Sequence, residues 1–559
     1  MMGGCVYALT LAASCMLCLS ACAEETQGPV VESKLGALRG QYIGVKGQEA
    51  DIQAYLGVPF AKPPVGQLRL APPQPADGWE GVRDATKQPF ICLQPKAFLE
   101  GLLQFLGMHA ELPDVSEDCL YLNIYAPASA APGTDLPVMV WIHGGGFTGG
   151  SASIFDASGL AAYQNVVVVA IQYRLGLLGF LSTGDGTIPG NLGLLDQVEA
   201  LRWVQRNIRA FGGDPDLVTI FGESAGGVSV SLLAISPLSA GLFQRAIAQS
   251  GTAAMEALMS DQPELMAQTI ADTLGCDASS EKLARCLRNI DPNVFTALSM
   301  DPTLRFLVTV DGHLLTDRVT KIFQDRQFPK IPFMTGVNSD EGGWLLPSMF
   351  FPPNWTEGLD REPAMAILGF FHPEPKDKPV LDLLGEEYLG TSEDRNEIRQ
   401  GFTNLLGDLL FTVPAIHTAN AHRDAGAPVY LYQFQYAPQF LRDKRPSFVR
   451  ADHGDEMFSV LGFCFTTTHI QLSSVCTEEE LKLSKLVMSY WGNFARTGSP
   501  SGPGLVAWPQ YGPQEDYLSI GMEQEVLQHL ARERFAFVTQ TIPERLSAGR
   551  KGHAEHPEL

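Results

Sequence analysis

Residues 217–227 read LVTIFGESAGG, and this stretch decides the fold. Leu217 to Phe221 predict a short buried strand, the pattern G-x-S-x-G follows at once, and an apolar helical run continues to Ile235. A serine on such a sharp strand-to-helix turn is held strained and exposed, with a helix N-terminus aimed at it. The context favours a nucleophile at Ser224 over an ordinary turn serine.

Strand-like and helix-like segments alternate on both sides of this turn. Strands are predicted at 136–142, 166–173, 331–337 and 429–436, and helices at 194–211 and 479–495. Continuous β-branched runs such as Val166 to Tyr173 are typical of strands buried on both faces. The alternation predicts an α/β fold with a mostly parallel central sheet and helices on both faces. No linker interrupts residues 24–545, so we expect one large catalytic domain there.

A glycine cluster, His143-Gly144-Gly145-Gly146, follows the strand predicted at 136–142. Its backbone can present N–H groups to the oxyanion of a tetrahedral intermediate, with the N–H of Ala225 completing the cradle. A glycine-rich turn after a strand is common by itself, but its position ahead of G-x-S-x-G favours the oxyanion role. We expect His143 to be a structural hydrogen-bonding residue, and Phe147 to line either the entrance or the core.

A serine nucleophile needs a base and an orienting carboxylate. Glu341 follows the strand predicted at 331–337 and His453 follows the strand at 429–436, 112 residues further on, so only folding can bring them together. Asp340 is an open alternative to Glu341, because spacing does not separate adjacent carboxylates. Asp452 and Asp455 are too near His453 in sequence to reach comfortably around its ring. Four further histidines are interpreted as packing or surface residues: His417, His422, His553 and His556.

Composition excludes several classes of protein. The 559 residues are 45% apolar and 18% charged, which is globular. The net charge is 39 − 62 = −23, and so acidic a surface argues against nucleic acid as a partner. After the leader, residues 165–182 come closest to a membrane span, but Arg174 interrupts them, so we expect no integral membrane segment in the mature chain.

Both ends of the chain carry targeting patterns. Residues 1–23 lack charged side chains and end in Ala21-Cys22-Ala23, which predicts a signal peptide cut after Ala23. An uncleaved anchor and a bacterial lipoprotein are the alternatives. Residues 546–559 form a polar tail that ends in His-Pro-Glu-Leu, similar to endoplasmic-reticulum retrieval signals, with Pro where Asp is usual. We therefore expect an endoplasmic-reticulum lumenal protein, a retrieval receptor as partner, and partial secretion.

Six cysteines remain after cleavage, and an even count in an oxidising compartment predicts three disulfides. Neither of the closely spaced pairs, Cys276 with Cys286 and Cys464 with Cys476, has the spacing of a zinc site, so we expect no structural metal. Asn354-Trp355-Thr356 is a glycosylation acceptor triplet.

The chain resembles the type-B carboxylesterase/cholinesterase family of α/β-hydrolases, most of all the vertebrate carboxylesterase 2 type of liver and intestine. Besides HGGG and GESAGG, the matching segments are QAYLGVPFA at 53–61, SEDCLYLN at 116–123, DEG at 340–342 and DHGDE at 452–456. These motifs span nearly the whole mature chain, so the likeness is specific.

The resemblance implies that Ser224, Glu341 and His453 are nucleophile, acid and base. It places the oxyanion donors at Gly145, Gly146 and Ala225, and it pairs Cys92 with Cys119 and Cys276 with Cys286. Cys464 and Cys476 lie outside the family's common disulfides; their pairing rests on their proximity in sequence.

These assignments predict a cofactor-free serine hydrolase that cleaves small to medium apolar esters, xenobiotic or lipid, through an acyl-enzyme. Its activity should fall in acid near the ordinary histidine pKa of about 6.5. No Trp lies between Cys92 and Cys119 to hold a quaternary ammonium, which disfavours choline esters. A non-catalytic adhesion protein and a bile-salt-activated lipase are the alternatives, and the oligomeric state stays open.

Overall fold

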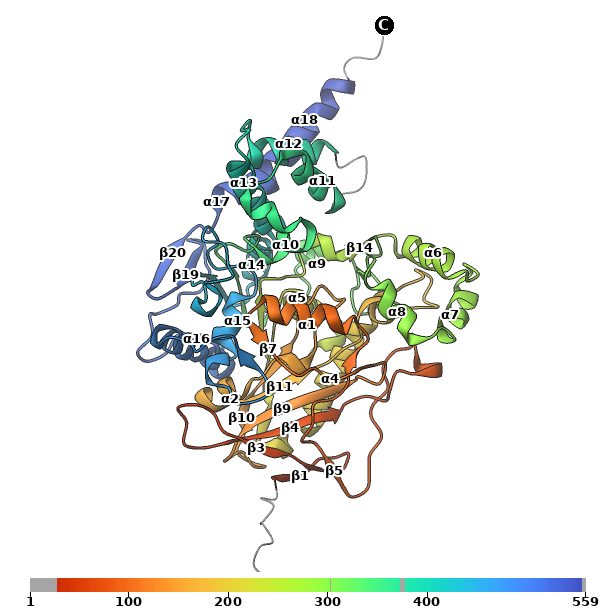
Figure 1. Cartoon of the computed structure of the whole chain (residues 1–559), viewed down its shortest axis with the longest axis vertical. Coiled ribbons are helices and arrows are strands. Elements are labelled where there is room, and N and C mark those ends of the chain that lie inside the picture. The colour runs from red at the N-terminus through yellow and green to blue at the C-terminus, as the bar shows by residue number, and fades with distance from the viewer. Residues whose placement is uncertain (1–27, 302, 372–377, 555–559) are drawn as a thin grey trace, which may run out of the picture.

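A mixed sheet of eleven strands forms the centre of the molecule (Figure 1). The computed structural model describes residues 28–301, 303–371 and 378–554; the expected leader and the final five residues lie outside these ranges. From β11 to β19 all neighbouring strands are parallel, and the pairs at both edges are antiparallel. In spatial order the strands are β20 (Gln524–Gln528), β19 (Asp516–Ile520), β17 (Val429–Phe434), β16 (Phe333–Asn338), β13 (Arg245–Gln249), β12 (Gly213–Glu223), β10 (Leu136–Ile142), β11 (Val167–Ile171), β9 (Tyr121–Pro127), β4 (Ile52–Pro59) and β3 (Gln41–Ile43).

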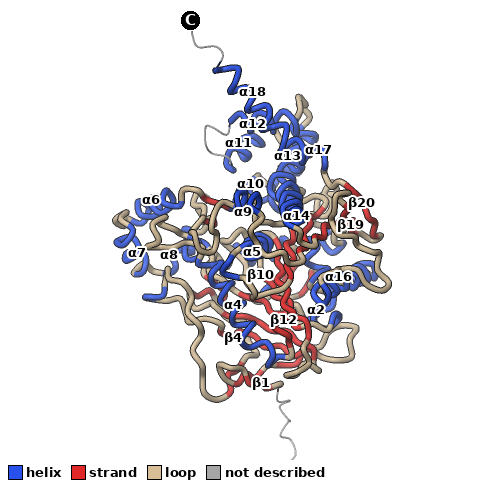
Figure 2. The backbone as a smooth tube through the Cα atoms, turned by 180° about the vertical axis from the view of Figure 1, so that it is seen from behind, coloured by secondary structure: helices blue, strands red, loops and turns tan. Residues whose placement is uncertain are grey.

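Alternate residues of the central strands enter two separate hydrophobic cores. On β10, Val138 and Val140 face one core, and Met139 and Trp141 face the other. This is the two-residue period of a strand buried on both faces. Helices α4 (Leu192–Asn207) and α5 (Ala225–Ile235) contribute to the first core, and α2 (Ser158–Gln164) and α16 (Glu478–Thr497) to the second. The sheet is therefore covered on both sides, and Figure 2 shows α4 and α5 against the strands from behind.

Helix α16 shows how local chemistry sets these boundaries. Thr477 and Glu480 form a reciprocal capping box at its start, and Gly498, with φ of 78°, ends it. Such a cap satisfies two backbone donors that the first helical turn leaves free. The helix expected at 479–495 is thus extended slightly at both ends, to 478–497.

A third, smaller core lies in a group of helices at one end of the molecule (Figure 1). The group comprises α10 (Leu345–Phe350), α11 (Arg361–Phe371), α12 (Lys378–Leu389), α13 (Arg395–Gly407) and α18 (Ile542–Ala554). Trp344, three residues after Glu341, is buried in this core. Helix α18 crosses position 546, where we expected the polar tail to begin.

The described residues contain three disulfides. They join Cys92 to Cys119, Cys276 to Cys286, and Cys464 to Cys476. The loop closed by the third contains β18 (Gln471–Leu472), which pairs with β7 (Met108–His109) inside the loop closed by the first. Within the described ranges no helix is long and apolar enough to cross a membrane.

Candidate active site

The candidate residues converge where parallel strands end. Ser224 directly follows β12, Glu341 lies three residues after β16, and His453 lies on the segment that leaves β17. The carboxyl ends of parallel strands share one edge of a sheet, and ligands of such sheets bind there. Register adds a closer constraint: Ile142 of β10 stands opposite Gly222 of β12, so the glycine cluster begins beside Ser224.

Ser224 has the strained backbone expected of a serine at such a turn. Its φ of 57° and ψ of −125° lie in a region that side chains other than glycine rarely adopt. Its N–H donates to the Gln249 carbonyl at 2.9 Å, and its carbonyl accepts from Val228 in the first turn of α5. A Cβ added to Gly251 would lie 2.1 Å from the Ser224 carbonyl oxygen, so only glycine allows this approach.

His453 and Glu341 are in direct contact. Nδ1 of His453 lies 2.7 Å from Oε2 of Glu341, and both side chains are almost fully buried. The other carboxylate oxygen, Oε1, accepts from the Ser250 hydroxyl and from the Asn338 N–H, each at 2.6 Å. With both oxygens occupied, the carboxylate is fixed in place and directs Nε2 of the imidazole away from itself.

The rival carboxylates are engaged elsewhere. Asp340 accepts from the Arg450 N–H at 3.0 Å. Asp452 accepts from the backbone N–H groups of Trp344 and Leu345, and Asp455 forms an ion pair with Arg445 at 2.6 Å. Of these adjacent acids, Glu341 is the one in contact with the imidazole.

Nε2 of His453 makes no hydrogen bond with the Ser224 hydroxyl; it lies 3.1 Å from Oε1 of Glu223. The alignment of that pair is not that of a hydrogen bond. Within the described part of the chain the Ser224 hydroxyl makes no hydrogen bond either. Catalytic hydrogen bonds are often long or unformed before substrate binds. Glu223 connects the two residues, because it directly precedes Ser224 in the chain and lies beside the His453 imidazole.

The buried carboxyl groups around His453 have shifted pKa values and shift the pKa of the imidazole in turn. Burial raises the pKa of Glu223 to about 8, and burial also raises the pKa of Glu456 to about 7. Burial alone would lower the pKa of His453, but the neighbouring Glu223 and Glu341 carboxylates outweigh it and hold that pKa above the ordinary value. The ordinary histidine pKa of about 6.5, which we used to predict the fall of activity in acid, is therefore too low for His453 in this environment.

The glycine cluster presents free donors beside the serine. A Cβ on Gly144 would lie 3.0 Å from Cβ of Ser224, which shows how closely the two segments approach. Gly145 and Gly146 have φ of 107° and 61° and are exposed. Among the described residues neither of their N–H groups has an acceptor. Together with the N–H of Ala225 at the start of α5, they can stabilise a developing oxyanion.

The neighbours of the cluster are structural. His143 is buried, stacks on Tyr173 and contacts the Gly144 carbonyl through Nδ1 at 2.9 Å. Burial lowers the pKa of His143 to about 4, so the ring stays neutral, in keeping with a hydrogen-bonding role. Phe147 is fully buried and packs on Phe180, so of its two expected positions the core is the observed one.

Other singled-out residues lie apart from this site. His422 is buried and stacks on Phe333, and His417 lies within ring contact of Phe323, as packing residues do. Asn354 is exposed on the 3-10 helix Pro353–Glu357. His553 falls in α18 at side chains the structure does not describe, and His556 lies beyond the described residues.

Sequence reasoning missed three polar groups of the site. Glu223 stands inside the G-x-S-x-G motif, where it could have been found as the one ionisable residue. Glu456, on α15 (Asp455–Val460), ends the DHGDE segment at 452–456, where it was given no role of its own. Ser250 carries no local signal, because it follows β13 and reaches the site only after folding. Among residues 28–301, 303–371 and 378–554, no cluster of three or more His, Cys, Asp or Glu side chains could hold a metal ion.

Comparison with known proteins gives one consistent result. The model of the family described as "Carboxylesterase family" matches residues 27–538. The medium-chain fatty acyl-CoA hydrolase precursor of Anas platyrhynchos is 44% identical over 546 residues, 96% of each chain. The cocaine esterase of Oryctolagus cuniculus is 44% identical, covering 96% of this chain and all of the relative, and the pyrethroid hydrolase Ces2a of Mus musculus is 43% identical, covering 96% and 95%.

Proposed function

The chain belongs to the carboxylesterase family and is an ester-hydrolysing enzyme with an α/β-hydrolase fold, and from that premise we propose that Ser224, His453 and Glu341 carry the reaction through an acyl-enzyme. The observation that supports this assignment best is the 2.7 Å contact between Nδ1 of His453 and Oε2 of Glu341, at the strand edge where Ser224 sits. The mostly parallel centre of the sheet supplies that edge.

In this mechanism Nε2 of His453 moves from Glu223 to the Ser224 hydroxyl. Nε2 then takes the proton of that hydroxyl. The serine oxygen attacks the ester carbonyl, and the oxyanion forms against the N–H groups of Gly145, Gly146 and Ala225. Protonated His453 gives its proton to the departing alcohol. Water, activated in the same way, then releases the acid. Glu341 holds the imidazole in the right tautomer and stabilises its charged form.

The substrates we propose are small to medium apolar esters, xenobiotic or lipid. The ring of Phe411, itself buried, lies 4.3 Å from the His453 ring, so an apolar side chain borders the base. The relatives named cocaine esterase and pyrethroid hydrolase act, by their names, on cocaine and on pyrethroids. A panel of p-nitrophenyl esters from acetate to palmitate tests this range; a preference for palmitate that requires bile salt would favour the lipase alternative.

We place the enzyme in the endoplasmic-reticulum lumen, with some secretion, and assign a glycan to Asn354. Three disulfides support an oxidising compartment, and exposure of Asn354 supports modification there. A retrieval receptor would bind the last four residues, and their deletion should raise the secreted fraction. To test the glycan, wild type and Asn354→Gln are treated with a glycosidase. We expect the wild type to lose mass and the variant to keep its mass.

The catalytic assignment is tested by labelling with a fluorophosphonate, which reacts with activated serines. We expect one phosphonyl group per chain, recovered on the peptide that contains Ser224. Ser224→Ala should not be labelled. A label on another serine, or no label on a folded enzyme that hydrolyses esters, would refute the assignment.

A further inference from the structure

Gln94 makes an unusual contact with the backbone behind the glycine cluster. Its side chain, only 1% exposed, pairs with both polar groups of Gly150: Oε1 accepts from the Gly150 N–H at 2.9 Å, and Nε2 donates to the Gly150 carbonyl at 2.7 Å. Nε2 also donates to the Cys92 carbonyl at 3.1 Å. The buried side-chain amide thus satisfies both the N–H and the carbonyl of Gly150, as the backbone of a neighbouring strand does in a sheet.

Gly150 is in turn packed directly against the residues that carry the oxyanion donors. A Cβ on Gly150 would lie 2.4 Å from the Gly144 carbonyl oxygen, and a Cβ on Gly145 would lie 2.4 Å from the Gly149 carbonyl oxygen. The Gly145 carbonyl accepts from the Gly149 N–H at 3.0 Å. In the loop of residues 143–150, the outgoing side at 144–145 and the returning side at 149–150 are therefore in backbone contact, with no side chain between them. A shift of Gly150 would thus move Gly145.

The other supports of the loop hold different positions. The Tyr173 hydroxyl donates to the His143 carbonyl at 2.7 Å, and the Gly176 N–H donates to the Phe147 carbonyl at 2.8 Å. These bonds fix the start and the middle of the loop. On the returning side of the loop, Gln94 holds Gly150, and the Ser151 hydroxyl next to it donates to Gln172 Oε1 at 2.7 Å.

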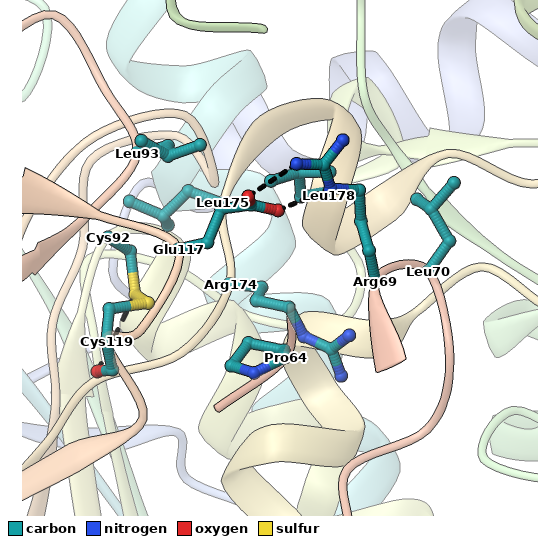
Figure 3. Close-up of a pocket in the computed structure, with 10 residues that line it drawn as sticks. All are labelled: Pro64, Arg69, Leu70, Cys92, Leu93, Glu117, Cys119, Arg174, Leu175 and Leu178. Carbon is teal, nitrogen blue, oxygen red and sulfur yellow. Dashed lines mark hydrogen bonds and ion pairs between the residues drawn. A yellow bond between two sulfur atoms is a disulfide. The ribbon is translucent and has the colours of Figure 1, made fainter. Parts of the chain in front are cut away.

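Gln94 is itself firmly anchored. It lies two residues after Cys92, whose disulfide to Cys119 borders a small cavity beside the buried ion pair of Arg69 and Glu117 (Figure 3). The Arg69 guanidinium contacts both carboxylate oxygens of Glu117 at 2.6 Å. The disulfide therefore ties the segment of Gln94 to Cys119, and the bidentate ion pair with Arg69 holds Glu117, two residues before that cysteine.

We infer that Gln94 is a positioning residue of the oxyanion hole: by holding Gly150 it sets the direction of the Gly145 and Gly146 N–H groups. The inference rests on the proposed function. Stabilisation of an oxyanion depends on donors that are oriented before charge develops, and small displacements of such donors are costly. Loss of the Gln94 amide should therefore weaken binding of the transition state and leave binding of the ester ground state unchanged.

The test compares Gln94→Met, which keeps the length but loses the amide, with Gln205→Met. Gln205 donates through Nε2 to the Pro215 and Leu242 carbonyls at the opposite end of β12, so this control loses two hydrogen bonds to backbone, where Gln94→Met loses three. For p-nitrophenyl butyrate, we expect Gln94→Met to lower kcat about 10- to 100-fold with KM unchanged. The inhibition constant of an alkyl trifluoromethyl ketone, whose adduct carries an oxyanion, should rise by the same factor, and that of the matching methyl ketone should not.

Gln94→Glu provides a second variant if Gln94→Met does not fold; it keeps an acceptor for the Gly150 N–H, loses the donor to the Gly150 carbonyl, and should shift the same constants in the same direction. The inference is overturned if a folded Gln94 variant keeps kcat and trifluoromethyl ketone affinity within twofold of wild type, or if Gln205→Met reproduces its losses. Phosphonate labelling of the wild type separates the two proposals: if Ser224 is labelled but the Gln94 variants behave as wild type, this inference alone fails.

Discussion

The carboxylate of Glu223 lies 3.1 Å from Nε2 of His453, on the opposite side of the imidazole from Glu341. The imidazole therefore stands between two buried carboxylates. Glu223, the residue before Ser224 in sequence, is the carboxylate that lies at Nε2. This relationship links the protonation of His453 to the charge on Glu223.

Glu223→Gln should move the acid limb of the pH–activity profile to lower pH. A negative charge beside an imidazole favours its protonated form, so removing that charge lowers the pKa of His453 and keeps the neutral base available in more acidic solution. We expect a shift of about one pH unit in the midpoint of kcat/KM. Glu515→Gln removes a carboxylate that pairs with His529 at the sheet edge and is the matched control. An unchanged midpoint, or a shift to higher pH, would contradict the coupling.

Glu341→Gln should reduce kcat about 10⁴-fold, because an amide favours the wrong imidazole tautomer and cannot stabilise its charged form. Asp340→Asn should stay within about tenfold of wild type, since Asp340 contacts the Arg450 backbone and not His453. Steady-state kinetics on one ester, with thermal unfolding to verify folding, decide between them. The opposite ranking would transfer the acid role to Asp340.

Replacing both Cys464 and Cys476 with Ser should loosen the β18–β7 pairing. The disulfide spans 12 residues, and a loop of that size corresponds to about 2–3 kcal/mol in the chain-entropy model. We expect faster amide hydrogen exchange over residues 106–110, where the Gly107 carbonyl also accepts from the Ser473 N–H. The Cys276/Cys286 double Ser variant is the control and should leave that segment unchanged. Equal effects in the two variants would argue against a local role for the third disulfide.

Much of the fold could be predicted because its signals are local. The strand expected at 136–142 is observed with those bounds, since its residues are buried on both faces and a glycine cluster ends it. The helix expected at 194–211 becomes α4 followed by a 3-10 turn at Ile208–Phe211, because Gly212 in the left-handed region tightens the last turn.

The site was predictable only in part, because its final geometry is non-local. Spacing could not separate Asp340 from Glu341; the choice depends on Ser250, Asn338 and His453 meeting one carboxylate. The contact of Glu223 with His453 depends equally on how the segment after β17 returns to the sheet. Neither relationship leaves a pattern along the chain.

The central claim is that Ser224 is the nucleophile of this hydrolase, and its most direct test is the kcat of Ser224→Ala on p-nitrophenyl butyrate. The assignment predicts a fall of about a millionfold, as in other serine hydrolases that lose the attacking oxygen. A correctly folded Ser224→Ala enzyme that retained activity within tenfold of wild type would contradict it.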